Sequence, residues 1–316
     1  MIRIEILKTK PRKEIQEKMK ILITGGAGFI GSHVTEVLIN KGHEIIVVDN
    51  LNRGKLQNLS NIKNKIRFLN INIIDFELMK EIISKVDIVF HLAAVSRVMP
   101  SIENPELCFK TNVQGTEIIS RLCSIFNKKL IFSSSREVYG TAEYIPVDEK
   151  HPTNSENPYG TSKICGEKII EAYSKCYGLR YAILRLSNVF GARDFDRVIP
   201  IFIEKALKND ELIVFGGGQI LDFVYINDVV KSFIKILDVN ENIIVNIGSG
   251  NGTNIFDIAE TIKKITKSES KLTIKEKRKG EVEKFIANIE RSEKILNWMP
   301  KITLEEGIKL LIKNHQ

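Results

Sequence analysis

The chain has 316 residues, of which 43% are hydrophobic, and a formal net charge of +8. This length accommodates one large domain or two coupled ones around a sizeable core. No apolar run reaches the roughly 20 residues that a membrane helix needs, and the basic N-terminus lacks the apolar segment of a secretory signal, so we expect a cytoplasmic protein with no membrane contact.

The distribution of charge and of cysteine disfavours two further classes of function. Residues 1–18 hold six basic and three acidic side chains, so +3 of the excess lies there and the remaining +5 is scattered. A modest scattered charge suits the site of an anionic small molecule at least as well as a polynucleotide surface, and we expect no nucleic-acid partner. The four cysteines show neither a CxxC spacing nor an adjacent histidine pattern, which predicts reduced thiols and no metal site.

Short β-branched runs alternate with helical segments along the first part of the chain. Residues 1–18 are interpreted as an extension, because Met19 is followed at once by the strand-like run KILIT. The predicted strands are residues 21–24, 44–49, 66–71, 86–93, 129–135 and 180–187, and the predicted helices span about 30–40, a segment ending near 84, 112–126 and a segment after 158. Continuous apolar strands between amphipathic helices indicate a parallel sheet covered on both faces. The fold class is therefore α/β, a doubly wound Rossmann-type sheet.

The alternation loosens beyond Ser187, which suggests a division of the chain. We expect residues 19–187 to form the nucleotide-binding domain. A smaller, interleaved C-terminal region would bind the substrate through residues 188–222 and 249–316, while strands within about 223–248 would return to the main sheet.

A glycine-rich loop, TGGAGFIG, lies between the first predicted strand and the first predicted helix. Gly26, Gly28 and Gly31 match G-x-G-x-x-G, in which glycine lets backbone N–H groups approach a pyrophosphate at a helix N-terminus. Asp49 ends the second strand, where its carboxylate can accept hydrogen bonds from the adenosine ribose hydroxyls. Because a carboxylate there would repel a 2′-phosphate, NAD is favoured over NADP.

The segment PYGTSK supplies a candidate catalytic pair. Tyr159 and Lys163 lie four residues apart at a predicted helix start, so both project from one face about one turn apart. A nearby ammonium stabilises a phenolate and lowers the tyrosine pKa from about 10 towards the working pH. Tyr159 is then a candidate general base.

Nine motifs in order resemble the extended short-chain dehydrogenase/reductase family. They are TGGAGFIGSH, VVDNLNRG, HLAA, FSSSREVYG, NPYGTSK, RLSNVFG, DFVYINDVV, NIGSG and ILNW, and they extend from about Lys20 to the last predicted helix. Within the family the sequence is most similar to the nucleotide-sugar epimerases and dehydratases, above all the UDP-glucose 4-epimerases. The resemblance implies bound NAD, a nucleotide-diphosphate-sugar substrate, and a homodimer built on the helices around 105–126 and 159–177.

The resemblance also implies the residues that bind NAD. They come from the glycine-rich loop, the ends of the following strands and the catalytic pair: Gly25, Gly26, Gly28, Phe29, Ile30, Gly31, Asp49, Asn50, Asn72, Ile73, Leu92, Ala93, Ala94, Ser133, Tyr159 and Lys163.

Catalysis and substrate binding follow from the same resemblance. Tyr159 would remove the proton of the sugar 4-hydroxyl while C4 gives hydride to the nicotinamide, and after rotation of the 4-keto sugar the hydride would return to its other face. The catalytic hydroxyl, three residues before Val-Tyr-Gly, is Ser135. Asn188 and Arg278 would contact the diphosphate and the backbone of Phe215 the base, although Arg278 is also readable as a solvated charge. The substrate-binding residues would be Ser96, Ser135, Arg136, Glu137, Asn188, Val198, Phe215 and Arg278.

The chain departs from the epimerase pattern at three positions. Leu221 stands where a phosphate-binding arginine is usual, and Arg193 or Arg197 are candidate replacements. Asn72 replaces an adenine-contacting aspartate, and its amide oxygen can still accept a hydrogen bond. Phe285 falls where bulk limits the sugar pocket, which favours plain hexoses over N-acetylated ones.

Three alternatives to epimerisation are open: dehydration, decarboxylation and a non-catalytic role. A 4,6-dehydratase needs a further acid and base, an Asp-Glu pair before Val-Tyr-Gly, where this chain has Arg136 and Glu137; arginine is no useful acid at neutral pH. The decarboxylases of the family share the glutamate, but the residues usual around their catalytic tyrosine are missing here. A non-catalytic NAD-binding regulator has only the basic extension in its favour.

Overall fold

The computed structural model describes residues 17–278, 280 and 282–315, so residues 1–16 of the predicted extension lie outside the described residues. Within them, seven parallel strands form the main sheet, in the order β3-β2-β1-β4-β5-β6-β10. Their bounds are β1 Lys20–Thr24, β2 Glu44–Val48, β3 Ile66–Leu69, β4 Ile88–His91, β5 Lys129–Ser135, β6 Tyr181–Leu186 and β10 Ile243–Ile247. The order reverses between β1 and β4, which opens a crevice at the carboxyl ends of these strands. The predicted doubly wound α/β sheet is confirmed.

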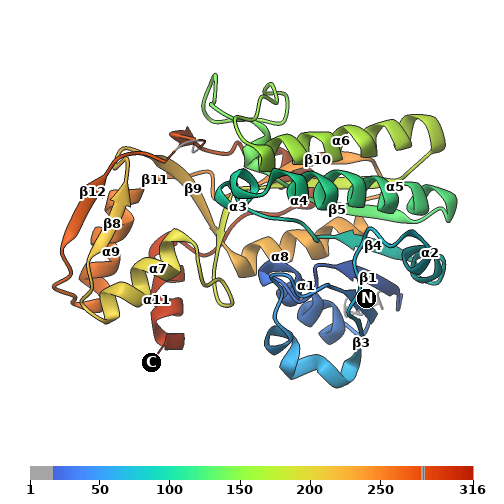
Figure 1. The fold of residues 1–316 in the computed structure, drawn as a ribbon, viewed down its shortest axis with the longest axis horizontal. Coiled ribbons are helices and arrows are strands. Elements are labelled where there is room, and N and C mark those ends of the chain that lie inside the picture. Colours follow the sequence, from blue (N-terminus) through green and yellow to red (C-terminus); the bar gives the residue numbers. More distant parts are fainter. Residues whose placement is uncertain (1–16, 279, 281, 316) are drawn as a thin grey trace, which may run out of the picture.

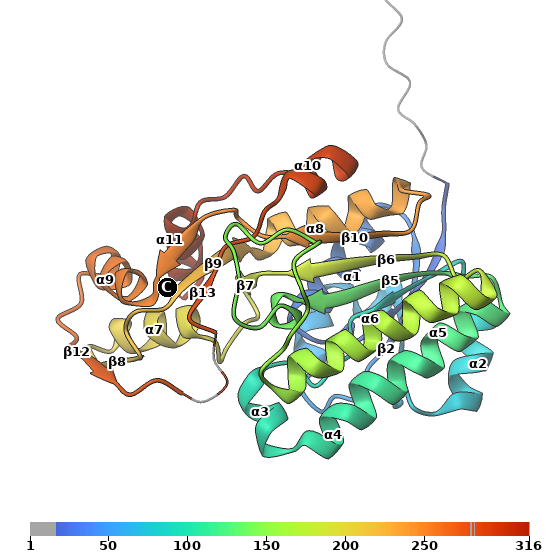
Figure 2. The same ribbon diagram turned by 90° about the horizontal axis from the view of Figure 1, so that it is seen from above.

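Helices cover both faces of this sheet (Figures 1 and 2). One face carries α1 (Phe29–Asn40) and α8 (Ile226–Lys235), and the other carries α2 (Phe76–Ser84), α5 (Gly115–Ile125) and α6 (Pro158–Tyr177). The alternation of side chains along β1 explains the two layers: Ile21 and Ile23 belong to one buried core and Leu22 to the other. A strand buried on both sides must be apolar at successive positions, which is the pattern that Ile21, Leu22 and Ile23 show.

Short helical segments connect the strands. They include η1 (Leu56–Lys65), α3 (Val98–Glu103), α4 (Pro105–Phe109), η3 (Arg136–Val138) and η4 (Ile236–Asp238). The helix predicted over 112–126 is part of a longer helical run, in which α4 continues through a π-helical turn, η2 (Lys110–Gln114), into α5.

The C-terminal region packs beside the carboxyl edge of the sheet, at the left of Figure 1. Its described strands form a four-stranded sheet and a two-stranded one. The bounds are β7 Asn188–Phe190, β8 Leu212–Phe215, β9 Ile220–Tyr225, β11 Gly252–Asn254, β12 Leu272–Lys275 and β13 Lys284–Phe285, with helices α7 Val198–Leu207, α9 Ile255–Thr266 and α11 Leu304–His315. Helix α10 (Glu290–Leu296) packs beside β10 of the main sheet instead (Figure 2).

The strands within 223–248 differ from the expectation in one respect. Strand β10 returns to the main sheet beside β6, but β9 pairs with β7, β11 and β13 instead. The cause lies in Asp222 of β9, whose buried carboxylate accepts hydrogen bonds from the backbone N–H groups of Ser249, Gly250 and Ala287. These bonds hold β9 among the loops of the C-terminal region.

In the part of the chain that the structure describes, every helix is too short or too polar to cross a lipid bilayer.

Candidate active site

A large pocket opens at the carboxyl ends of the main-sheet strands, between the sheet and the C-terminal region. Its volume is about 1030 Å³, which is the upper end of the range usual for ligand sites, roughly 300 to 1,000 Å³. Every predicted site residue lines it except Gly26. A Cβ at Gly26 would lie 2.7 Å from Cγ1 of Val47, so this glycine allows the loop to pack on β2.

The glycine-rich loop is shaped for close approach of a backbone to a ligand. Gly25 has φ +71° and passes so near β4 that a Cβ would lie 2.6 Å from the nitrogen of Ala93. A Cβ at Gly31 would lie 2.1 Å from the carbonyl oxygen of Gly25, whereas one at Gly28 would meet that oxygen at 3.2 Å. Gly28 lines the pocket at the N-terminus of α1, where backbone N–H groups can donate to a pyrophosphate.

Asp49 lies beside this loop and stabilises it. Its carboxylate accepts hydrogen bonds from the backbone N–H groups of Ala27, at 3.0 Å, and Leu51, at 2.9 Å. Burial raises its pKa, and the two bonds work against that shift. The arrangement allows this carboxylate to organise the loop and still face the pocket with its remaining acceptor capacity.

Helix α6 presents the catalytic pair. It begins after Asn157, whose side chain accepts from the N–H of Gly160 at 2.9 Å, and Pro158 occupies the first turn. One turn into the helix, Nζ of Lys163 donates to the carbonyl oxygen of Ser133 at 2.8 Å and lies 6.0 Å from the ring centroid of Tyr159. Lys163 is thereby aimed at the end of β5, where Ser133 and Ser135 also line the pocket.

The pKa of Tyr159 is raised, whereas the sequence predicted that the nearby ammonium of Lys163 would lower it. Burial raises the pKa of Tyr159, and the two largest influences that lower it are a hydrogen bond with Ser135 and the charge of Arg197. Burial lowers the pKa of Lys163 to about 8. Burial thus opposes ionisation of the Tyr159 phenol, and the interaction with Ser135 and the charge of Arg197 work against that effect.

Ser134 has a structural environment. Its hydroxyl donates to Glu167 of α6 at 2.5 Å, and the same carboxylate forms a buried ion pair with Arg185 of β6 at 2.6 Å. Arg185 also donates to the hydroxyl of Tyr139 at 3.0 Å. Tyr139 is buried away from the pocket lining, so the motif Val-Tyr-Gly contributes to packing.

Arg136 and Glu137 form a second buried ion pair, with 2.8 Å between NH2 and Oε1. Glu137 also accepts from Nδ2 of Asn157 at 3.0 Å, and Arg136 donates to Oδ1 of Asn188 at 3.4 Å. Among the described residues, Nε and NH1 of Arg136 have no hydrogen-bond partner. Both side chains line the pocket beside Ser135, where one offers positive charge and the other a carboxylate.

The far wall belongs to the C-terminal region. Val198, Phe215 and Leu221 line it, and the guanidinium carbon of Arg278 lies 3.8 Å from the ring centroid of Phe215. Phe285 is buried against Tyr139 and does not line the pocket. Its ring therefore supports the wall behind Arg136, and the expected preference for plain hexoses loses its direct basis.

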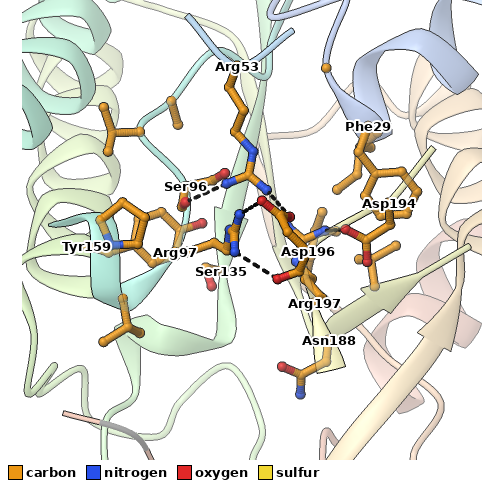
Figure 3. A pocket seen from close by; sticks show the side chains of 18 of the residues that line it. Phe29, Arg53, Ser96, Arg97, Ser135, Tyr159, Asn188, Asp194, Asp196 and Arg197 are labelled. Atoms are coloured by element: carbon orange, nitrogen blue, oxygen red, sulfur yellow. Dashed lines mark hydrogen bonds and ion pairs between the residues drawn. The ribbon is translucent and has the colours of Figure 1, made fainter. Parts of the chain in front are cut away.

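Charged side chains, of which the sequence analysis singled out only Arg197, cross the same pocket (Figure 3). Asp196 forms ion pairs with Arg53 and Arg97, and Asp194 pairs with Arg197 at 3.1 Å. These residues lie in three loops, and their motifs carried no signal that the loops meet. Of the two arginines suggested as replacements at Leu221, Arg193 is held by Glu36 at 2.6 Å, with Ser32 at 3.2 Å, and Arg197 by Asp194.

Proteins named as nucleotide-sugar enzymes are similar to this chain over nearly its whole length. The chain is 43% identical over 300 residues to a Methanocaldococcus jannaschii protein provisionally named UDP-glucose 4-epimerase, with 92% of this chain and 97% of the relative covered. It is 33% identical over 313 residues to UDP-N-acetyl-alpha-D-glucosaminuronate decarboxylase of Bacillus cytotoxicus, with 94% and 97% covered. The crystal structure of Thermotoga maritima UDP-glucose 4-epimerase with UDP-glucose has a TM-score of 0.90 and 36% identity, over 94% of this chain and 98% of that one.

The glycine cradle and Asp49 fit a dinucleotide, since the space beside Gly28 and the N-terminus of α1 are what a pyrophosphate requires. The family model described as the NAD dependent epimerase/dehydratase family matches residues 21–248, most of the chain. The chain therefore belongs to the NAD dependent epimerase/dehydratase family, and its cofactor is NAD.

Proposed function

We propose that the protein is a nucleotide-sugar 4-epimerase of the UDP-glucose/UDP-galactose type. The observation that carries the proposal is the convergence of Ser135, Tyr159 and Lys163 on one pocket with the dinucleotide loop. The similarity to proteins named UDP-glucose 4-epimerase supports it, although a decarboxylase is also similar to the chain.

The residues would divide the work as follows. NAD, when bound, supplies a hydride acceptor at the sugar C4 and returns the hydride. Tyr159 would accept the 4-hydroxyl proton with Ser135 sharing it, because both side chains line the pocket and Ser135 lowers the pKa of the phenol. The ammonium of Lys163, fixed by Ser133, would hold the nicotinamide ribose and favour the phenolate.

A 4,6-dehydratase remains the alternative because of one observation. Glu137 presents a pocket-lining carboxylate next to Ser135, which suits a base for elimination. Its neighbour Arg136 cannot donate a proton at neutral pH, so the acid for the departing hydroxyl would have to come from elsewhere. Decarboxylation is the other outcome to test, since it shares the oxidation at C4 and would follow from a carboxylate at C6.

The test is product analysis by NMR. Purified protein would be incubated with UDP-glucose, UDP-galactose, their N-acetyl counterparts, dTDP-glucose and UDP-glucuronic acid. We expect UDP-glucose and UDP-galactose to interconvert. Formation of a 4-keto-6-deoxy sugar would show that the protein is a dehydratase, and loss of CO₂ would show that it is a decarboxylase. If no sugar is turned over, a non-catalytic NAD-binding regulator would be favoured.

We further propose a homodimer through the helices that flank the catalytic pair. Exposed apolar side chains lie there, with Phe109 of α4 38% exposed, Ile125 of α5 58% and Tyr177 of α6 69%. Sedimentation equilibrium should give twice the monomer mass, and a monomer at micromolar concentration would overturn this part.

A further inference from the structure

Asp196 is held between two arginines in the middle of the pocket (Figure 3). NH2 of Arg53 lies 2.8 Å from Oδ1 of Asp196, and Arg97 forms an ion pair with Oδ2 and donates to the backbone carbonyl of Asp196 at 2.9 Å. Arg53 also donates to the carbonyl of Ser96 at 3.3 Å. One carboxylate thus receives both guanidinium groups.

The three partners come from opposite sides of the pocket. Arg53 follows β2 and Arg97 follows β4 of the main sheet, whereas Asp196 lies between β7 and α7 of the C-terminal region. Arg97 has φ +102°, a backbone conformation that residues with a Cβ rarely adopt. In this conformation the side chain of Arg97 points into the pocket, between Tyr159 and Phe29 (Figure 3).

The charges at this point are not balanced. Arg53, Arg97 and Arg197 share two carboxylates, Asp194 and Asp196. Burial, followed by the nearby charges of Arg53 and Arg197, lowers the pKa of Arg97 to about 10. The cluster therefore has a surplus positive charge in a cavity already suited to an anionic ligand.

The two carboxylates differ in how easily a ligand could displace them from the arginines. The side chain of Asp194 is 1% exposed and remains beside Arg197, whereas that of Asp196 is 50% exposed. An exposed ion pair is weak because water solvates its members almost as well. A ligand diphosphate, with more acceptor oxygens and charge than one carboxylate, is a stronger partner for two planar guanidinium groups.

We propose that Arg53 and Arg97 are a diphosphate-binding pair of this pocket, and that Asp196 occupies the pair until a diphosphate displaces it. The inference rests on the proposed function only in taking the anion to be a diphosphate. Two sources share this chemistry, the pyrophosphate of NAD and the diphosphate of the sugar nucleotide, and separate ligands distinguish them.

The test is isothermal titration calorimetry with UDP, NAD and inorganic pyrophosphate, none of which requires turnover. Asp196→Asn should lower the Kd of the displacing ligand about threefold to tenfold, because the side chain that competes for the arginines loses its charge. Arg97→Gln should weaken the same ligand about tenfold or more. In Arg97→Gln/Asp196→Asn the tightening should disappear, which is the signature of competition for one arginine.

A matched control is Glu204→Gln, which removes one acidic charge of the exposed pair with Lys208 on α7, outside the pocket lining. It should leave the affinities unchanged. If Asp196→Asn strengthens the binding of UDP alone, the arginine pair binds the substrate. If it strengthens the binding of NAD alone, the pair binds the cofactor. The inference is overturned if Asp196→Asn leaves every affinity unchanged or weakens it, or if the wild-type protein binds none of the three ligands. Binding with these responses but without sugar turnover would remove the proposed function and leave the inference standing.

Discussion

Arg136 and Glu137, adjacent in the chain, form an ion pair at the end of β5 in which both side chains are less than one-tenth exposed. Neighbouring charges of opposite sign in a loop usually point into water. Here the 3₁₀ turn η3 directs both inward, towards Asn157 and Asn188. The pair therefore has consequences for stability and for the choice between reactions.

Removing one member of this pair should be costly. Glu137→Gln leaves the Arg136 guanidinium buried without its counterion, and we expect the free energy of unfolding to fall by about 3–5 kcal/mol. Urea denaturation measures it. The exposed control Glu204→Gln should change it by no more than about 0.5 kcal/mol. An equal effect of the two substitutions would mean that the Arg136–Glu137 pair does not contribute as a buried one. If the protein is an epimerase, Glu137→Gln should still convert UDP-galactose below its unfolding midpoint, whereas an elimination that used Glu137 as base would stop.

Two tyrosines twenty positions apart should respond oppositely to loss of their hydroxyl. Tyr159→Phe removes the proposed base, so sugar turnover should fall by about 10²- to 10⁴-fold while NAD stays bound. Tyr139→Phe removes a hydroxyl that donates to Asn246 at 2.6 Å and accepts from Arg185. It should cost about 1–3 kcal/mol of stability with little change in rate at low temperature. Steady-state kinetics and thermal denaturation of both variants decide, and full activity of Tyr159→Phe would rule out the assigned base.

Two glycines of the loop should separate folding from NAD binding. In Gly31→Ala the new methyl group would lie 2.1 Å from the carbonyl oxygen of Gly25, so stability should fall by about 1–3 kcal/mol. In Gly28→Ala the same contact would be 3.2 Å, which a shift of a few tenths of an ångström relieves, so the loss of stability should be smaller than in Gly31→Ala. The methyl group at Gly28 would nevertheless occupy the space of the pyrophosphate, so we expect NAD affinity to fall at least tenfold. Urea denaturation checks the stability of both variants and calorimetric titration checks their NAD affinity, and normal NAD affinity of Gly28→Ala would contradict the placement.

Lys163 should produce opposite pH trends in stability and in NAD binding. Burial lowers its pKa from 10.5 to about 8, so between these values the unfolded chain binds more protons than the native one. The free energy of unfolding should therefore gain a positive contribution as pH rises from about 8 towards 10.5. NAD affinity should decline over the same range, because the neutral amine is a weaker donor to the ribose. Lys163→Met should remove both contributions, which denaturation and titration at several pH values would show.

The alternation of strands and helices and the dinucleotide loop could be predicted from the sequence, which also singled out the candidate catalytic side chains. Local physics explains this: an apolar strand buried on both faces, a glycine forced by a close approach, and a Tyr-Lys pair one helical turn apart each leave a pattern within a few residues. The placement of Gly28, Ser135, Tyr159 and Lys163 around one pocket then follows from the parallel sheet, whose strand ends converge.

Only the tertiary structure decided three further points. It showed that Asp222 holds β9 in the C-terminal region, that Arg136 and Glu137 turn inward, and that Asp196 meets Arg53 and Arg97 across the pocket. Arg53 and Asp196 are 143 residues apart. Their contact depends on loops whose conformation is set by packing at both ends, and such long-range pairing leaves no periodicity in one sequence. The sequence thus determined the fold and the candidate for the base, and the structure decided which charges face one another in the site.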